Sequence, residues 1–431
     1  MEKKRILILG SGISGLSAAW HLAKKSDAYD CTLLEKSKTP GGWMSSHKEQ
    51  DFLIEGGPRV FKTSRNREFL QIVDEIGFAS SLLFSSSRAK SRFLWTDGKF
   101  QKVPKISFSL LYSLWEERKI SPVFEDETIW DFTVRRFGKD IADKLVDPMV
   151  LGIYAGDSKL LSTKACFPFL KNLEKEHGSV IKGMFSLLTK KKPKAAFKAP
   201  LFSFKEGTGS FVRKWKEKIP FPVYYDQEIT SLRRENGIWK AQSQTQTWEA
   251  DAVILAIPAS AAAKLLRQEA PKTSHLLQTI PYEDITTLHL GWKGDMLPFS
   301  AFGYLVPTLE KEPVLGVLFD TKIFGKKDTL ITVMIRGVFH SEEELKNIAK
   351  RVATHHLKIA QEPDLFSYKR MPYAIPQYVL GHLEKKEDLL KALQEETEHL
   401  YLVGNYLDGV SVNDCIKNAG KIAEECTNKT H

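Results

Sequence analysis

The chain has 431 residues, of which 42% are hydrophobic, so it can bury a large core in two or three domains and is not a disordered or fibrous protein. Its formal net charge of +10 at pH 7 favours anionic partners. Nucleic acid, an anionic membrane surface and a carboxylated small molecule all fit that charge.

The first predicted element is an apolar strand at residues 5–9, which runs directly into Gly10, Gly12 and Gly15 and then into a helical pattern. In this order the three glycines permit a tight turn, close backbone approach to a pyrophosphate, and packing of the helix on the strand. The N-terminus of the helix offers unpaired N–H groups to phosphate. The alternative is that the glycines only close a turn between strand and helix.

A second apolar strand at residues 31–34 ends in Glu35, about 20 residues after the glycines, where an acid is expected to bind a ribose hydroxyl. Further glycines follow at Gly41-Gly42-Trp43 and at residues 55–59 (Glu-Gly-Gly-Pro-Arg). A nicotinamide cofactor needs only the first strand, helix and strand. The extra glycines favour the longer FAD, whose ribityl chain and ring need more backbone beside them.

Residues 88–170 are rich in aromatic and basic residues and are expected to be mostly helical. Residues 108–115 and 180–188 are short apolar segments, and the second leads into a run of lysines at 190–194. Such a helix could contact an anionic membrane surface, or it could be a core helix with a solvated tail. Since the first strand begins at residue 5, a cleaved signal peptide has no room, and we expect a cytoplasmic protein, peripheral on the inner face of the cytoplasmic membrane if the helix binds lipid.

Strands separated by turns are predicted at 228–232, 237–241 and 250–258, and residues 276–384 alternate as in a sheet. A last apolar strand at 400–406 leads to a loop and a helix at about 416–426. The predicted fold is α/β (α+β overall), with a discontinuous Rossmann-like FAD-binding domain, a substrate domain built on a large mixed sheet, and a helical subdomain. The FAD-binding domain is assigned to 1–87, 207–275 and 385–431, the helical membrane-contacting subdomain to 88–170, and the substrate domain to 171–206 and 276–384.

The four cysteines are scattered, which favours free thiols, and no spacing predicts a metal site. The residues also show no catalytic triad or paired acids.

The opening motif resembles that of the FAD-dependent amine oxidase and protoporphyrinogen oxidase superfamily, and Gly-Gly-Trp with Gly-Pro-Arg is the form typical of protoporphyrinogen oxidases. Similar segments at 92–95, 147–157, 303–307, 315–319 and 404–415 extend the resemblance over nearly the whole chain. The resemblance implies oxidation of protoporphyrinogen IX to protoporphyrin IX. Six electrons leave the porphyrinogen substrate in three rounds and pass through FAD to oxygen, with no catalytic side chain, metal or nucleic acid involved.

The resemblance also assigns site residues. Arg92 matches an arginine that anchors a substrate propionate, Leu305 and Leu318 match apolar clamp positions, and Ala155 and Gly156 match the pocket rim. Met334 stands where the family often has a phenylalanine. Arg59 is assigned to the flavin shell and not to the substrate. The expected cofactor residues are Gly10, Ser11, Gly12, Ile13, Ser14, Gly15, Glu35, Gly41, Gly42, Trp43, Gly57, Pro58, Arg59, Val60, Ile229, Gly404, Val410, Ser411 and Val412.

Several alternatives stay open at this point. The same machinery could oxidise coproporphyrinogen III to coproporphyrin III, and the wider superfamily includes amine and carotenoid oxidases. A flavin-free binding protein of similar fold has no need of Glu35 or the paired glycines. The sequence also leaves open whether the chain forms a homodimer.

Overall fold

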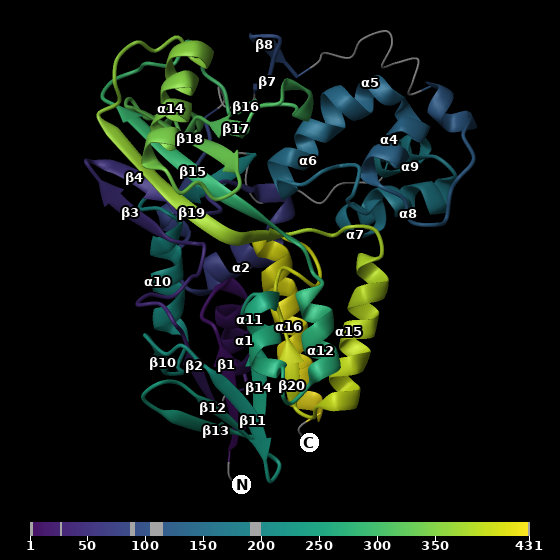
Figure 1. Ribbon diagram of the computed structural model, residues 1–431, viewed down its shortest axis with the longest axis vertical. Helices are drawn as coiled ribbons and strands as arrows, with labels where there is room; N and C mark the ends of the chain where they lie inside the picture. Colours follow the sequence, from purple (N-terminus) through teal and green to yellow (C-terminus); the bar gives the residue numbers. More distant parts are fainter. Residues whose placement is uncertain (1–2, 26–27, 87–90, 104–114, 190–199, 430–431) are drawn as a thin grey trace.

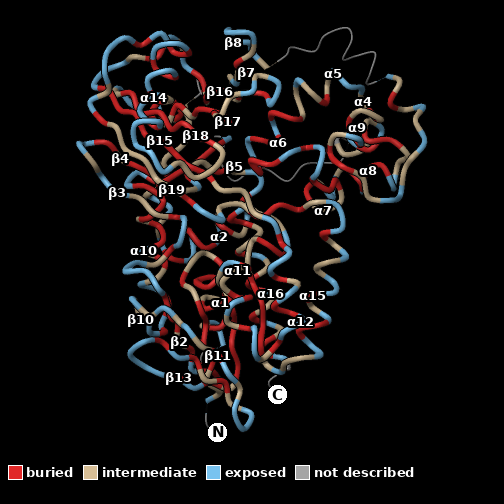
Figure 2. Tube along the Cα trace, viewed as in Figure 1, coloured by how far each residue is buried: buried red, intermediate tan, exposed pale blue. Residues whose placement is uncertain are grey.

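The computed structural model describes residues 3–25, 28–86, 91–103, 115–189 and 200–429. It has three parts: a lower part around a parallel sheet, an upper sheet, and a group of helices beside that sheet (Figure 1). Buried residues follow the sheets and the inner sides of the helices throughout (Figure 2).

The lower part is built on a five-stranded parallel sheet of order β10-β2-β1-β14-β20. Its strands are β1 (Lys4–Leu9), β2 (Tyr29–Leu34), β10 (Val223–Tyr224), β14 (Ala252–Leu255) and β20 (Leu400–Leu402). They come from three distant segments of the chain, as the sequence predicted for a discontinuous nucleotide-binding fold. In the central strands, residues 6–9 of β1 and all of β14 are buried on both faces, and these residues are all apolar.

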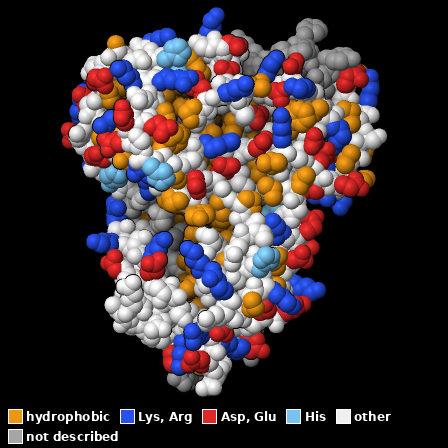
Figure 3. All heavy atoms as spheres, viewed as in Figure 1, with side chains coloured by type: hydrophobic (Ala, Val, Ile, Leu, Met, Phe, Trp, Pro, Cys, Tyr) orange, Lys and Arg blue, Asp and Glu red, His pale blue; other side chains and the backbone are white. Residues whose placement is uncertain are grey.

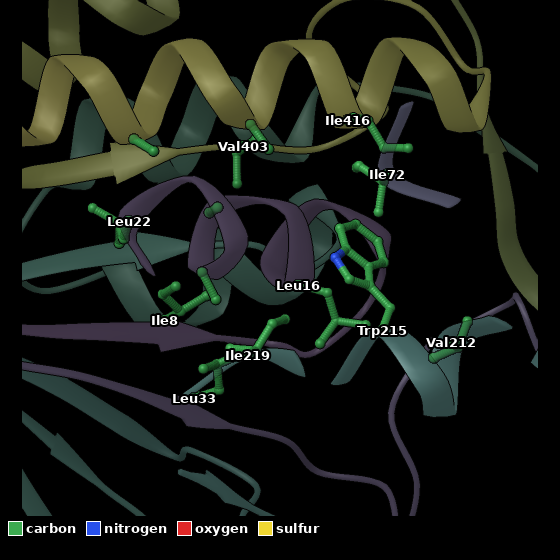
Figure 4. Packing of buried hydrophobic residues seen from close by; sticks show 14 of the residues in the cluster. Ile8, Leu16, Leu22, Leu33, Ile72, Val212, Trp215, Ile219, Val403 and Ile416 are labelled. Atoms are coloured by element: carbon green, nitrogen blue, oxygen red, sulfur yellow. The ribbon is translucent and has the colours of Figure 1, made fainter. Parts of the chain in front are cut away.

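Helices cover both faces of this sheet. On one face Ile8 and Leu33 pack with Leu16 of α1 (Ile13–Ala23) and Ile416 of α16 (Val412–Lys429), as Figure 4 shows. The other face packs with α11 and the antiparallel sheet β11-β12-β13. The remaining elements here are α2 (Arg67–Glu75), α10 (Thr208–Lys218), β11 (Ser231–Glu235), β12 (Ile238–Gln242), β13 (Thr247–Ala250), α11 (Ala259–Leu266), α12 (Pro271–Gln278) and α15 (His382–Glu396).

The upper part is a mixed seven-stranded sheet of order β19-β15-β18-β17-β16-β7-β8, in which only the β16–β7 pair is parallel. One face packs against α14 (Glu342–Arg351). Its strands are β7 (Arg92–Thr96), β8 (Lys99–Lys102), β15 (Tyr282–Trp292), β16 (Gly303–Leu305), β17 (Val314–Leu318), β18 (Thr329–Arg336) and β19 (Leu365–Pro376). The alternation at 276–384 thus predicted a real sheet.

Shorter elements join these parts. Small sheets pair β3 (Ser46–Glu49) with β4 (Phe52–Glu55), and β9 (Leu201–Phe204) with β5 (Phe61–Lys62) and β6 (Leu82–Phe84). The short helices are η1 (Thr63–Arg65), η2 (Ala79–Ser81), η4 (Glu117–Lys119), η5 (Ala142–Val146), η6 (Thr308–Glu310), α13 (Asp320–Ile323) and η7 (Val352–His356).

One stretch differs from expectation. Residues 92–102, expected within a mostly helical segment, form the hairpin β7–β8 and extend the upper sheet. Its turn is Asp97-Gly98, both with positive φ (51° and 70°), a strong hairpin signal. The division into domains stays a prediction.

The helical part consists of α4 (Ile129–Phe137), α5 (Lys139–Ile141), α6 (Asp147–Tyr154), α7 (Thr163–Cys166), α8 (Pro168–His177) and α9 (Val180–Thr189). Its centre holds the fully buried Arg136, which is paired with Glu117 and Glu174. Glu117 also accepts a hydrogen bond from the backbone N–H of Val180 at the start of α9 (2.8 Å). Across the described ranges, no helix combines the length and apolar character needed to cross a membrane.

Candidate active site

The turn between β1 and α1 explains why glycine is required at two positions. Gly10 has φ +97°, and a Cβ there would lie 2.6 Å from the carbonyl oxygen of Ala256. A Cβ on Gly15 would lie 1.9 Å from the carbonyl oxygen of Gly10. Both substitutions would clash with the chain's own backbone. A Cβ on Gly12 would meet no atom within 4 Å, so this glycine faces open space that a phosphate could approach.

Glu35 is held beside this turn by three hydrogen bonds. Its carboxylate accepts from the backbone N–H of Ser11 (2.8 Å), the hydroxyl of Ser11 (2.9 Å) and the backbone N–H of Ser37 (2.9 Å). The side chain is only 7% exposed. An acceptor-only group fixed at the end of β2 is suited to a ribose hydroxyl. The sequence predicted the acid but not the part that Ser11 plays in orienting it.

The paired glycines pack onto the same turn. The N–H of Gly41 donates to the carbonyl of Ser11 (2.8 Å), and a Cβ on Gly42 would lie 3.5 Å from the Cα of Gly12. A Cβ on Gly57 would lie 2.4 Å from the carbonyl oxygen of Trp43. Three glycine segments that are separate in the sequence therefore form one backbone surface, as an elongated cofactor would require.

The first turn of α16 lies beside the first turn of α1. The hydroxyl of Ser17 donates to the carbonyl of Ile416 (3.1 Å), and Ser411 caps α16 by accepting from the N–H of Asp414 (3.1 Å). Asn413, in the first turn of α16, joins this helix to α2: its side-chain amide donates to Glu68 (2.6 Å) and accepts from the N–H of Phe69 (3.1 Å). Two helix N-termini thus lie next to each other, and both favour negative charge.

Two other predicted cofactor residues lie on loops nearby. Ile229 follows Gln227, whose backbone N–H donates to the carbonyl of Glu35 (2.9 Å). Gly404 follows β20, and a Cβ there would lie 2.5 Å from the ring of Tyr406. The cofactor contacts of the whole set, which includes Ile13, Ser14, Pro58, Val60, Val410 and Val412, stay a prediction.

Four predicted substrate residues share one face of the upper sheet, the face opposite α14. Strand pairing aligns Arg92 with Gly303, Leu318 and Thr332, and in the next row it aligns Leu305 with Gly316, Met334 and Thr287. Directly paired residues point to the same side of a sheet, so these side chains lie on a common face. Arg92 is exposed, with its guanidinium 4.9 Å from the ring centre of Phe302.

The other two predicted substrate residues follow α6, which packs on this face. The carbonyl of Ala155 accepts from Arg336 (2.7 Å), and a Cβ on Gly156 would overlap Gln377 Oε1 at 1.9 Å. Ala155 belongs to an apolar cluster with Leu151, Ile285, Leu315 and Met371, and Met334 packs against it. The face therefore has an apolar end beneath α6.

Arg59 has its charge paired within the protein. Its guanidinium pairs with Asp320 (3.1 Å), donates to Thr332, and contacts the carbonyl of Glu55 (3.3 Å). Asp320 therefore balances the charge of Arg59, and the place of Arg59 in the flavin shell stays a prediction. Thr332 also forms a hydrogen bond with the buried His289 (3.0 Å). Burial, and after it the nearby charge of Arg59, holds the pKa of His289 well below its usual range.

Sequence reasoning missed Lys369 on β19. Its ammonium donates to the carbonyl of Gly56 (3.1 Å) and lies 5.2 Å from the ring centre of Trp43, between the two glycine segments. Burial, and then Arg59, lower its pKa. The sequence signal that could have found Lys369 was a lysine at a position of an alternating strand where the side chain faces into the protein.

A separate cavity of about 350 Å³ lies between β4, β9 and α13. Of the predicted site residues, only Arg59 lines it. We therefore place neither cofactor nor substrate there. Figure 3 shows hydrophobic side chains gathered along the middle of the molecule, between the upper and lower parts, with basic side chains spread around them.

A parallel dinucleotide-binding sheet joined to a broad mixed sheet is the architecture of a two-domain flavoprotein oxidoreductase. The chain belongs to the family of flavin-containing amine oxidoreductases, whose model matches residues 13–427. It is therefore a flavin-dependent enzyme. The family confirms the flavin cofactor predicted from the paired glycines.

Two relatives and one solved structure are similar to this chain over nearly its whole length. Protoporphyrinogen oxidase of Bos taurus is 29% identical, with 97% of this chain and 98% of the relative covered. Coproporphyrinogen III oxidase of Bacillus subtilis (strain 168) is 26% identical, with 98% and 97% covered. A solved structure from Exiguobacterium sp. 255-15, provisionally assigned as a protoporphyrinogen oxidase, has a TM-score of 0.85 at 21% identity over 99% of each chain and shows the same fold.

Proposed function

We propose that this flavoenzyme oxidises protoporphyrinogen IX to protoporphyrin IX with FAD as cofactor and oxygen as acceptor. Each of three rounds removes two hydrogens from the macrocycle and reduces one O₂ to H₂O₂. The observation that carries the proposal is the face of the upper sheet, with an arginine at one end and an apolar cluster at the other. A flat, apolar macrocycle with carboxylate arms has the same distribution of properties.

The residues fit an FAD molecule. The open space at Gly12 and the N-termini of α1 and α16 suit its phosphates, and the carboxylate of Glu35 suits a ribose hydroxyl. The backbone of residues 41–43 and 56–57 would lie along the rest of the cofactor. When bound, FAD supplies the redox chemistry by taking hydride from a methylene carbon of the substrate.

The protein's own part is then to bind and orient. Arg92 would pair with a propionate, because a guanidinium makes two parallel hydrogen bonds to a carboxylate. Leu305, Leu318 and Met334 would pack on the macrocycle and exclude water, and methionine is flexible enough to replace an aromatic ring there. Fixing the substrate's orientation by these contacts lowers the barrier without an acid or base.

The test compares protoporphyrinogen IX and coproporphyrinogen III as substrates of one preparation of the purified protein. The purified protein should be yellow, and acid extraction should release FAD. Protoporphyrinogen IX should give fluorescent protoporphyrin with oxygen uptake. A protein with FAD that oxidises neither porphyrinogen would contradict the proposal.

Coproporphyrinogen III is the second candidate, favoured by the Bacillus subtilis relative. A higher kcat/KM for coproporphyrinogen than for protoporphyrinogen in the same assay would select it. A homodimer stays a prediction.

We also propose peripheral contact with an anionic membrane through α9. This helix forms where the sequence predicted an apolar helix, and it exposes Met184 (48%) and Phe185 (63%). The lysine run at 190–194 and most of the segment 108–115 lie outside the described residues. The exposed apolar side chains and the basic sequence that follows them together support the proposal.

A further inference from the structure

Three basic residues gather near the end of the substrate face that carries Arg92. They are Lys62 at the end of β5, Arg65 at the end of η1, and Arg92 at the start of β7, and we name them the cationic cluster. All three are exposed. Arg65 and Arg92 both add to the effect of burial in lowering the pKa of Lys62, as neighbouring positive charges do.

The path of the chain explains why Lys62 lies near Arg92. Gly56 contacts Lys369 on β19 at one edge of the upper sheet. Three residues later Arg59 contacts Thr332 on β18, in the middle of the sheet. The segment therefore crosses the sheet from β19 towards β7, which begins with Arg92.

The cluster has no acidic partner in the described part of the chain, where no Asp or Glu forms an ion pair with Lys62, Arg65 or Arg92. Of the other basic residues on this face, Arg59 pairs with Asp320 and Arg336 lies 3.9 Å from Glu283, whereas Lys369 donates to the carbonyl of Gly56. The sequences at 87–90, 104–114 and 190–199 contain no Asp or Glu. Three neighbouring cations without a carboxylate form a site for an anionic ligand.

The opposite end of the face is apolar. Arg92 lies in the register row of Thr332, whereas Ile285 of the apolar cluster lies two rows away, in the row of Arg336. Leu151, Leu315 and Met371 complete that end under α6. Among the described residues, three positive charges without an ion pair thus lie at one end of the proposed substrate site, with Lys369 near its middle and Arg336, paired with Glu283, at the apolar end.

We propose that Lys62 and Arg65 act with Arg92 to bind both carboxylates of a porphyrinogen whose propionates lie along one edge. This inference rests on the proposed function and specifies its substrate. Protoporphyrinogen IX carries two propionates on neighbouring pyrroles and only methyl and vinyl groups elsewhere. Coproporphyrinogen III carries a propionate on every pyrrole, so two carboxylates would face the apolar end, where desolvation is unfavourable.

The test uses the FAD-loaded enzyme with Lys62→Gln, Arg65→Gln and the double variant. Arg67→Gln is the matched control, because Arg67 is also exposed and starts the next helix. Substrates are protoporphyrinogen IX, its dimethyl ester and coproporphyrinogen III. Binding of the product protoporphyrin, followed by quenching of protein fluorescence, gives a readout that is independent of turnover.

We expect each single variant to raise KM for protoporphyrinogen and Kd for protoporphyrin about three- to tenfold, with kcat and the flavin spectrum unchanged. The dimethyl ester should be oxidised equally by all variants, since it has no charge to lose. Unchanged KM and Kd in the double variant, or an equal loss on the ester, would refute the role of the cluster. Higher wild-type kcat/KM for coproporphyrinogen would refute the selectivity, and a wild type inactive on both porphyrinogens would refute the proposed function itself.

Discussion

Replacing Glu35 should weaken flavin binding and destabilise the apoprotein together. The carboxylate accepts three hydrogen bonds of 2.8–2.9 Å, two of them from Ser11 in the glycine turn. Bonds to a charged, buried acceptor contribute about 1.5–3 kcal/mol each and are not additive. Glu35→Ala should therefore lower the unfolding free energy of the apoprotein by about 2–4 kcal/mol, because two backbone N–H groups lose their acceptor.

Glu35→Ala should also weaken flavin binding, in addition to lowering the stability of the apoprotein. Removing the expected hydrogen bond between Glu35 and a ribose hydroxyl should weaken FAD binding about ten- to a hundredfold, because a charged hydrogen bond of the strength given above is lost. The assay is the flavin remaining after dialysis, followed by titration of apoprotein with FAD, with thermal unfolding in parallel. Asp30→Asn, an exposed acid on the same strand, is the control. A Glu35→Ala protein that keeps its flavin and its wild-type FAD affinity would refute the ribose assignment.

Four further predictions concern the rest of the molecule. Arg92→Ala should keep FAD but lose about tenfold in kcat/KM for protoporphyrinogen, and Arg92→Lys should recover only part, because an ammonium lacks the planar fork; unchanged kinetics would contradict the anchor. Arg136→Ala should cost about 3–5 kcal/mol in urea unfolding, because it leaves buried carboxylates unpaired. Burial alone would raise the pKa of Glu174, but hydrogen bonds from Arg136, the backbone of Val123 and Lys171 lower it to about 2. The stability that the Glu174 carboxylate gives the fold should therefore be complete above pH 4.5 and lost as the pH falls towards 2. Met184→Ser with Phe185→Ser should reduce sedimentation with anionic vesicles without changing the melting temperature, and equal sedimentation would favour an ordinary surface for α9.

Local patterns in the sequence were enough for the elements that carry the site. The strand at 5–9, with the glycines and the helical pattern that follow it, predicted the turn between β1 and α1, and alternation at 276–384 predicted the upper sheet. Each of these depends on periodicity and turn chemistry within a short window. The hairpin at 92–102 had such a signal in Asp97-Gly98, but the basic and aromatic residues around it favoured helix.

What could not be predicted depends on contacts between distant residues. The ion pair of Arg59 with Asp320, 261 positions later, leaves no signal in the glycine segment to which Arg59 belongs. Lys369 lies between glycine segments more than three hundred residues away only because β19 pairs beside β15. A resemblance in motifs predicts which residue types occupy a site. Which acidic residue pairs with each basic residue is determined only in the folded chain.

The order of strands in the parallel sheet has a consequence for biosynthesis. β1 and β14 are neighbours although 246 positions separate their paired residues, Leu9 with Leu255 and Ile8 with Ile254. β14 is made only after more than half of the chain, and β20, its other neighbour, is made later still. While the ribosome is still making residue 399, β14 has an open edge and α1 lacks the covering α16. The nascent chain therefore exposes apolar surface until residues 400–429 emerge, and slow, nonlocal pairing of this kind promotes aggregation. Cells making this protein should depend on chaperones until β20 and α16 have docked, and the N-terminus of α16 joins that of α1 only afterwards.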